Sequence, residues 1–261
     1  MFNYTLITGA TSGIGYEMSL LCAQKGHNLV LTGRNTVVLQ KMKEELSARY
    51  SVSVKTIVAD LSLPDSAIEI YRQVKDNKID IDILINNAGF GNFGPFSESD
   101  WAMEIKMMHV NIISLTHLTK LILQDMLKRN EGKICNIAST AGFRPGPLMA
   151  VYFATKAYVL SFSEAIAEEV RGTGVSVTTL CPGATKTNFT KTAGLDDSQF
   201  LQLKTMALPE DVAAYGYKHL MHGDGVVIHG VFNRILLFVQ RFIPRKLVSF
   251  VSRIIKEKKH R

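Results

Sequence analysis

The stretch Thr8-Gly9-Ala10-Thr11-Ser12-Gly13-Ile14-Gly15 lies between a strand-like run at residues 3–8 and a helical pattern that follows it. Glycine lets the backbone adopt positive φ angles and approach a ligand closely, and the free N–H groups at a helix start attract a phosphate. The spacing is Gly-x-x-x-Gly-x-Gly, which differs from the Gly-x-Gly-x-x-Gly of the general dinucleotide fingerprint. Its position directly after the first strand nevertheless predicts a nucleotide-binding turn.

Further strand-like runs and helical patterns alternate along the chain after this turn. The strand-like runs are residues 28–32, 52–58, 81–85, 133–137 and 175–180, and the helical patterns are residues 37–50, 64–75, 101–128 and 152–170. This alternation indicates a parallel sheet with helices on both faces. A chain of 261 residues with 46% hydrophobic composition is long enough for one such domain. We therefore expect an α/β fold, a single-domain Rossmann-like doubly wound parallel sheet at residues 1–230, followed by an extension at residues 231–261.

The second predicted strand is followed by Arg34. In a dinucleotide-binding fold, an acidic residue here would accept hydrogen bonds from the adenosine ribose, whereas an arginine suits a ribose with a 2′-phosphate. Arg34 therefore favours NADP over NAD, and Ser12 in the glycine turn could share that phosphate. The alternative is a solvated arginine at the start of a helix.

Polar residues follow the other predicted strands at their carboxyl ends. They are Asp60 and Leu61 after the third strand, Asn86 to Gly89 after the fourth, Ser139 after the fifth and Pro182 to Thr185 after the sixth. Ligands of such sheets bind beyond the carboxyl ends of the strands. These groups are therefore expected at one edge of the sheet.

Tyr152 and Lys156 open the last long helical pattern and are four residues apart, so they share one helix face. An unperturbed tyrosine titrates near ~10, and a neighbouring cation lowers that pKa. The pair can therefore act as an acid/base device. The spacing is also common by chance, so its interpretation depends on the rest of the chain.

Taken together, these motifs resemble those of the short-chain dehydrogenase/reductase family, in the group with a Thr-Gly-x-x-x-Gly-Ile-Gly cofactor loop. They occur in the family's order and span residues 8–187. The resemblance implies Tyr152 as general acid/base and Lys156 as the group that lowers the tyrosine pKa and holds the nicotinamide ribose. It also implies Ser139 as a donor to the substrate oxygen and Asn111 as the holder of a water that relays protons.

The resemblance further implies an NADP(H) site, preferred over NAD(H). Its residues would be Gly9, Thr11, Ser12, Gly13, Ile14, Gly15, Arg34, Asp60, Leu61, Asn87, Ala88, Gly89, Tyr152, Lys156, Pro182, Gly183, Thr185 and Thr187. The glycine turn would line the pyrophosphate, Asp60 and Leu61 the adenine, and Thr185 and Thr187 the nicotinamide amide. The family also implies a homodimer or homotetramer that assembles through residues 101–128 and 152–170.

Apolar residues gather in the segments expected to select the substrate. The loop after Ser139 contains Phe143, Pro145, Pro147, Leu148 and Met149, and Phe90, Phe93 and Phe189 lie elsewhere. They predict an apolar pocket for a lipophilic ketone or alcohol, although they could instead pack in the core or at a subunit interface. The stretch between Thr187 and Leu208, with Gly194, Asp196, Asp197 and Ser198, has the polarity of a mobile lid.

The net charge of +7 comes from the end of the chain. Residues 231–261 hold nine Lys or Arg against one Glu, which leaves 21 basic and 22 acidic residues before them. A nearly neutral body argues against nucleic-acid binding. Two basic amphipathic helices are expected in residues 231–261. They could contact a membrane surface peripherally, or cover the pocket or a neighbouring subunit.

The remaining features suggest a cytoplasmic protein without a metal. Three separated cysteines, no leader-like start and no apolar run of about 18 residues indicate a reducing compartment and no membrane span. His219 and His222 near Asp224 are too few ligands for a metal site. We expect an NADP(H)-dependent oxidoreductase of carbonyls and secondary alcohols that acts on a small-molecule substrate. The alternatives are a reductase of steroids, retinoids or 3-ketoacyl chains at a membrane surface, and a regulator that binds NADP without turnover.

Overall fold

The computed structural model describes residues 4–194 and 206–257. Within these ranges, seven parallel strands form one sheet in the order β3-β2-β1-β4-β5-β6-β7. The strands are β1 (Tyr4–Thr8), β2 (Leu29–Gly33), β3 (Val54–Val58), β4 (Ile81–Asn86), β5 (Gly132–Ile137), β6 (Val175–Cys181) and β7 (Val226–Ile228). The chain runs outward from β1 in one direction and then returns to β4 beside it, so β1 and β4 flank the point where the strand order reverses.

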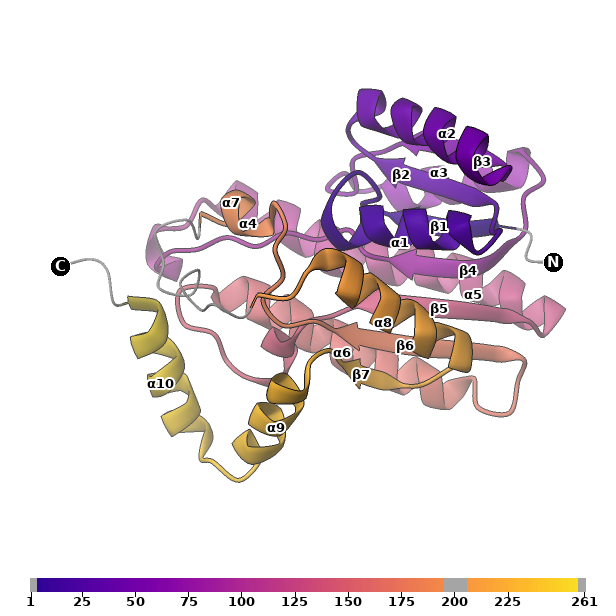
Figure 1. Cartoon of the computed structure of the whole chain (residues 1–261). Coiled ribbons are helices and arrows are strands. Elements are labelled where there is room, and N and C mark those ends of the chain that lie inside the picture. The colour runs from indigo at the N-terminus through magenta and orange to yellow at the C-terminus, as the bar shows by residue number, and fades with distance from the viewer. Residues whose placement is uncertain (1–3, 195–205, 258–261) are drawn as a thin grey trace.

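Helices cover both faces of this sheet (Figure 1). The main helices are α1 (Gly13–Gln24), α2 (Thr36–Tyr50), α3 (Ser66–Asp76), α4 (Trp101–Met108), α5 (Leu115–Arg129), α6 (Ala150–Glu169), α7 (Phe189–Thr192), α8 (Pro209–His222), α9 (Val231–Gln240) and α10 (Arg245–Glu257). Helices α1, α2 and α8 pack on one face, and α3, α5 and α6 pack on the other.

Alternating strand residues supply the two cores. In β4, Ile83 and Ile85 face the α1, α2 and α8 side, whereas Leu84 faces the α3, α5 and α6 side. All three side chains are fully buried. Burial on both faces explains why these strands read as nearly continuous apolar runs. The structure thus confirms the expected single-domain, doubly wound parallel sheet.

The structure also adds elements that the sequence pattern did not resolve. Strand β7 has only three residues, too few to show a periodic pattern. The helical pattern at residues 101–128 is divided into α4, the π-helical segment η2 (His109–Ser114) and α5. Two short 3-10 helices, η1 (Phe96–Glu98) and η3 (Thr140–Phe143), lie in loops beyond β4 and β5.

The three cysteines are free and buried, as the sequence indicated. Cys22 lies in the core between α1 and the sheet, and Cys181 ends β6. They therefore serve as small packing residues.

Candidate active site

A cavity of about 520 Å³ opens beyond the carboxyl ends of the strands. This is within the range of small-molecule sites, roughly 300–1,000 Å³. Residues from the loops after β1, β2, β3, β4, β5 and β6 line it, together with α6 and α7. Of the catalytic and cofactor residues predicted from the sequence, all except Gly15 and Asn111 are among its lining residues.

The glycine turn forms one end of this cavity. Gly9 and Gly13 have φ angles of +64° and +56°, which favour glycine. A Cβ on Gly9 would lie 2.9 Å from the Cα of Ala88, so the two loops are in close contact. Ser12 precedes α1, and its exposed hydroxyl makes no capping hydrogen bond. The start of α1 therefore offers N–H groups and a free hydroxyl that fit a phosphate.

Gly15 lies behind the turn, where it allows α1 to approach the neighbouring loop. A Cβ at this position would collide with the Nδ2 atom of Asn87 and the carbonyl oxygen of Gly9. The role of Gly15 is therefore to shape the turn, since it does not line the cavity.

Thr8 joins the loops after β1 and β4, a role that the sequence did not reveal. Its Oγ1 accepts hydrogen bonds from the backbone N–H groups of Asn87 and Ala88, both at 3.0 Å. In return, Asn87 Nδ2 donates to the carbonyl oxygens of Thr8 and Gly9, at 3.0 and 3.1 Å. The predicted cofactor residues of the two loops thus form one hydrogen-bonded unit.

Two cations line the cavity near Asp60. Burial raises the pKa of the Asp60 carboxyl, but hydrogen bonds from Ser62 and the nearby charges of Arg34 and Lys106 outweigh it, so the pKa is lowered. Ser62 donates through its backbone N–H at 3.0 Å and its hydroxyl at 2.8 Å. Lys106, exposed on α4, was not predicted, because only the tertiary fold brings it beside the end of β3.

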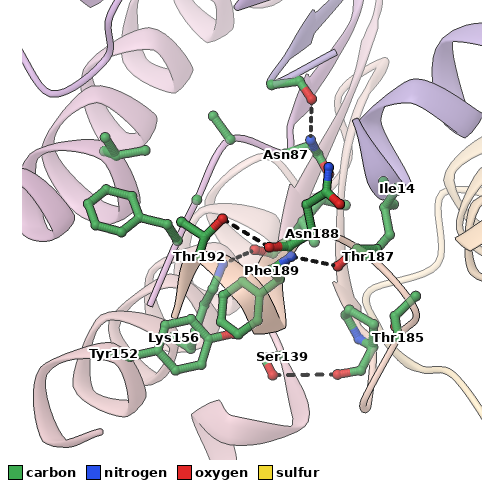
Figure 2. Close-up of a pocket in the computed structure, with 18 of the residues that line it drawn as sticks. Ile14, Asn87, Ser139, Tyr152, Lys156, Thr185, Thr187, Asn188, Phe189 and Thr192 are labelled. Carbon is green, nitrogen blue, oxygen red and sulfur yellow. Dashed lines mark hydrogen bonds between the residues drawn. The ribbon is translucent and has the colours of Figure 1, made fainter. Parts of the chain in front are cut away.

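Helix α6 carries Tyr152 and Lys156, and both side chains are buried, with exposures of 9% and 5%. Figure 2 shows them with Ser139 around one part of the cavity, next to Phe189. Lys156 Nζ donates to the carbonyl oxygen of Ile137 at 2.8 Å and lies 6.0 Å from the Tyr152 ring centroid. Ser139 Oγ accepts from the N–H of Ala141 at 3.0 Å. An acid/base side chain, a cation and a hydroxyl therefore share one buried space.

Burial controls the protonation of this pair. It raises the pKa of Tyr152 to about 12, although the Ser139 side chain acts in the opposite direction. It lowers the pKa of Lys156 to about 8. We expected the lysine to lower the tyrosine pKa, but the net shift in this structure is upward, because desolvation dominates both groups. The phenol is therefore protonated at neutral pH and can donate its proton.

Asn111 lies in η2 and is fully buried. Its Nδ2 donates to the carbonyl oxygen of Phe90 and to Thr155 Oγ1, both at 3.0 Å, and its Oδ1 accepts from the Phe90 N–H at 3.1 Å. All three of these hydrogen bonds join the Asn111 side chain to Phe90 and Thr155. The water relay through Asn111 therefore stays a prediction. What the structure shows is a positioning residue that ties the loop after β4 to α6.

The predicted apolar pocket is present in part. Phe90, Met149 and Phe189 line the cavity, and the rings of Tyr152 and Phe189 are 5.1 Å apart. Phe93 packs beside them in the same cluster. Phe143 follows the alternative of core packing, because it packs against a separate core cluster with Leu115, Val159 and Leu160 and does not line the cavity.

Other residues of the predicted pocket and lid are placed elsewhere. Pro145, Pro147 and Leu148 do not line the cavity, and the Leu148 carbonyl accepts from the Gly94 N–H at 2.8 Å. Gly194 ends the first described segment, while Asp196, Asp197 and Ser198 lie outside the described residues. His219 Nδ1 lies 2.6 Å from Asp224 Oδ2, so this histidine is paired with a carboxylate.

Arg144 is a further cavity residue that the sequence did not single out. Its Nε atom is buried, and among the described residues it has no hydrogen-bond partner. Burial lowers the pKa of the guanidinium. Since a buried N–H group without a partner is unfavourable, a carboxylate or phosphate group of a ligand would suit it.

The sequence matches known proteins over most of its length. A family model for short chain dehydrogenases matches residues 3–198. The very-long-chain 3-oxoacyl-CoA reductase of Rattus norvegicus is 31% identical over 72% of this chain and 61% of its own length. The 17-beta-hydroxysteroid dehydrogenase type 3 of Mus musculus is 36% identical over 73% of this chain and 63% of its own length. The chain thus spans less than two thirds of these two relatives.

A solved structure has the same fold and is similar to this chain over nearly the full length of both proteins. The short-chain dehydrogenase of Sphingobium yanoikuyae, determined in complex with NADPH, has a TM-score of 0.82 and 30% identity. The match covers 92% of this chain and 93% of that one.

Proposed function

The chain belongs to the short-chain dehydrogenase family, and on this premise we propose that it is an NADP(H)-dependent oxidoreductase that interconverts a carbonyl and a secondary alcohol. The observation that carries the proposal is the shared cavity. Buried Tyr152 and Lys156 lie with Ser139 in one part of it, and the glycine turn and Arg34 line another. A dinucleotide bound beside a small substrate would occupy both parts.

In this proposal the proton chemistry belongs to Tyr152. A bound nicotinamide cofactor supplies the hydride in reduction and accepts it in oxidation. Tyr152 gives its phenolic proton to the carbonyl oxygen in reduction and takes it back in oxidation. The donor hydrogen bond of the Ser139 hydroxyl to the Pro182 carbonyl is long, at 3.5 Å. It can therefore turn to donate to the substrate oxygen as negative charge develops there.

Lys156 would supply positive charge and hold the ribose next to the nicotinamide. Its side chain is directed by the Ile137 carbonyl at 2.8 Å, and Gly89 leaves room beside it, since a Cβ there would lie 3.4 Å from Nζ. An ammonium has three donors, of which this contact uses one. The others can serve a ligand in the cavity.

Three features support NADP(H) over NAD(H). Arg34 lines the cavity at the end of β2, and Lys106 places a second positive charge near the same carboxylate, Asp60. Ser12 offers a hydroxyl that makes no capping hydrogen bond. The Sphingobium yanoikuyae relative binds NADPH. Guanidinium and ammonium groups suit a 2′-phosphate.

Substitution Arg34→Ala is expected to weaken NADPH binding by about tenfold to a hundredfold, the loss of a charge-assisted hydrogen bond. NADH affinity should stay unchanged, because NADH lacks the 2′-phosphate. Paired fluorescence titrations of both cofactors measure this, with Lys25→Ala as the control for an exposed cation outside the cavity. A wild type that binds both cofactors equally would refute the preference.

Carbonyl reduction and alcohol oxidation should depend on pH in different ways. Reduction needs the Tyr152 proton, which is present below about pH 12, and the Lys156 charge, which is present below about pH 8. Reduction should therefore be level near neutrality and fall above about pH 8. Oxidation needs the phenolate together with the same Lys156 charge, so it should rise up to about pH 8 and level off above it. Measurement of kcat/KM in both directions tests this, and an oxidation plateau below neutral pH would contradict it.

A lipophilic substrate is supported by Phe90, Met149 and Phe189 in the cavity wall. The second candidate is a reductase of steroid or 3-ketoacyl substrates at a membrane surface. The names of the two mammalian relatives and the exposed apolar residues of α9 and α10 favour it. Arg144 would then receive an anionic group of the substrate.

The alternative from another class is an NADP-binding regulator without turnover. Oxidation of NADPH with a panel of ketones separates the two, since a regulator binds the cofactor and leaves it unchanged. We also propose a homodimer or homotetramer through α4, η2, α5 and α6, where Trp101, Ile113 and Tyr158 are exposed. The buried free cysteines support a cytoplasmic location.

A further inference from the structure

Helices α9 and α10 expose their apolar residues to an extent that α1, α2, α3, α5, α6 and α8, which cover the sheet, do not. Twelve large hydrophobic side chains in residues 231–254 are at least 37% exposed, with Phe232 at 74% and Phe242 at 76%. They are Val231, Phe232, Ile235, Leu236, Phe238, Val239, Phe242, Ile243, Leu247, Phe250, Val251 and Ile254. Soluble proteins rarely expose a contiguous apolar surface of this kind without a binding role.

The inner side of α9 explains which face is left outside. Leu237 is buried, Asn233 Nδ2 donates to the His229 carbonyl at 2.8 Å, and Gln240 Nε2 donates to the Phe143 carbonyl at 3.0 Å. These three residues follow the spacing of one helix face and hold α9 against the domain. Phe232, at another position of the helix, therefore stays in solvent.

Helix α10 also turns apolar residues toward solvent. Leu247, Phe250, Val251 and Ile254 follow an i, i+3, i+4, i+7 spacing and are all exposed, whereas Ser252 is only 4% exposed. A helix of a soluble domain turns its apolar stripe inward. Here the apolar stripe is outside and a small polar residue is inside.

The same surface is positively charged. Arg234, Arg241, Arg245, Lys246 and Arg253 are all exposed, and residues 231–254 contain no Asp or Glu. Two copies of such a face would bring like charges together, which is unfavourable. An anionic lipid surface instead attracts each basic residue and accepts the apolar side chains.

We propose that α9 and α10 form a docking surface, defined as residues 231–254, that binds the surface of an anionic phospholipid bilayer. With ten and thirteen residues, the helices are too short to cross a hydrocarbon core of about 30 Å. Within the described segments, every helix is too short or too polar to span a bilayer. The two helices therefore lie in the interface.

The docking surface adjoins the active-site edge. Figure 1 shows α9 and α10 beyond the carboxyl ends of the strands. Asn233 packs against Gly183, a cavity residue, where an added Cβ would lie 2.5 Å from its Nδ2. Docking would thus hold the cavity near the bilayer, where lipophilic carbonyl compounds concentrate. The proposal stands on the surface alone and does not depend on the reaction.

Vesicle flotation of the full chain tests it, with vesicles of phosphatidylcholine alone or mixed with phosphatidylglycerol. The wild type is expected to float with the anionic vesicles, and added salt should release it. The double variant Phe232→Asp/Phe242→Asp should lower the bound fraction by at least about tenfold. Its matched control, Val37→Asp/Phe96→Asp, changes two exposed hydrophobic residues outside the docking surface and should bind as the wild type does.

Charge is tested separately by Arg241→Glu/Arg245→Glu, which should remove the preference for anionic vesicles. Lys25→Glu/Lys55→Glu makes the same net change at exposed positions elsewhere and should retain it. No flotation of the wild type with anionic vesicles would overturn the proposal. The proposal would also fail if a docking-surface variant floated as the wild type does. It would fail as well if a docking-surface variant changed the oligomeric state, measured by light scattering, while neither the wild type nor any variant bound vesicles. Because NADPH oxidation is measured without lipid, failure here remains distinct from failure of the proposed function.

Discussion

Substitution Tyr152→Phe is expected to lower kcat by about two to four orders of magnitude, the usual contribution of a positioned general acid or base. The change removes only the hydroxyl. The ring contacts with Phe153 and Phe189, at centroid distances of 5.9 and 5.1 Å, can be retained. NADPH affinity and thermal stability should therefore stay close to the wild-type values.

Steady-state kinetics, cofactor titration and thermal unfolding of one preparation measure these three quantities. Tyr158→Phe is the matched control, because Tyr158 lies on the same helix with 39% exposure and outside the cavity. The control should keep wild-type turnover. A Tyr152→Phe enzyme with kcat within about twofold of the wild type would remove Tyr152 from the chemistry.

Substitution Gly15→Ala is expected to weaken cofactor binding by about fivefold to 150-fold, since overpacking in a close-packed site costs about 1–3 kcal/mol. The added Cβ would collide with Asn87 Nδ2 and with the Gly9 carbonyl oxygen. The backbone atom cannot move without a shift of the glycine turn. The melting temperature should also fall, because the start of α1 packs against the loops after β1 and β4 at this contact.

Gly225→Ala is the control for this substitution. A Cβ on Gly225 meets no atom within 4 Å, and its φ angle is not in the positive range. It should leave both cofactor affinity and melting temperature unchanged. If Gly15→Ala bound NADPH as tightly as the wild type does, the close packing of the glycine turn would have no part in cofactor binding.

Local signals explain what the sequence could predict. The glycine turn is contiguous, and the spacing of Tyr152 and Lys156 places both on one face of any helix. The strand runs were visible because both faces of β4 and its neighbours are buried. Alternation of strands and helices then fixed the carboxyl edge, so most predicted site residues meet in one cavity.

Features that depend on tertiary contacts were missed. The sign of the Tyr152 pKa shift depends on how deeply the pair is buried, which residue spacing does not reveal. Phe143 and Phe189 have the same chemistry, yet only Phe189 lines the cavity. Lys106 and Arg144 become cavity residues through folding alone. The outward apolar face of α9 follows from the inward contacts of Asn233 and Gln240.

The most direct test of the central claim is deuterium transfer from NADPH labelled at its transferable position to a panel of lipophilic ketones, with the products analysed by mass spectrometry. The wild type is expected to yield an alcohol that carries one deuterium, and Tyr152→Phe almost none. Tight NADPH binding with no labelled alcohol from any ketone would contradict it, and would favour a regulator that binds the cofactor without turnover.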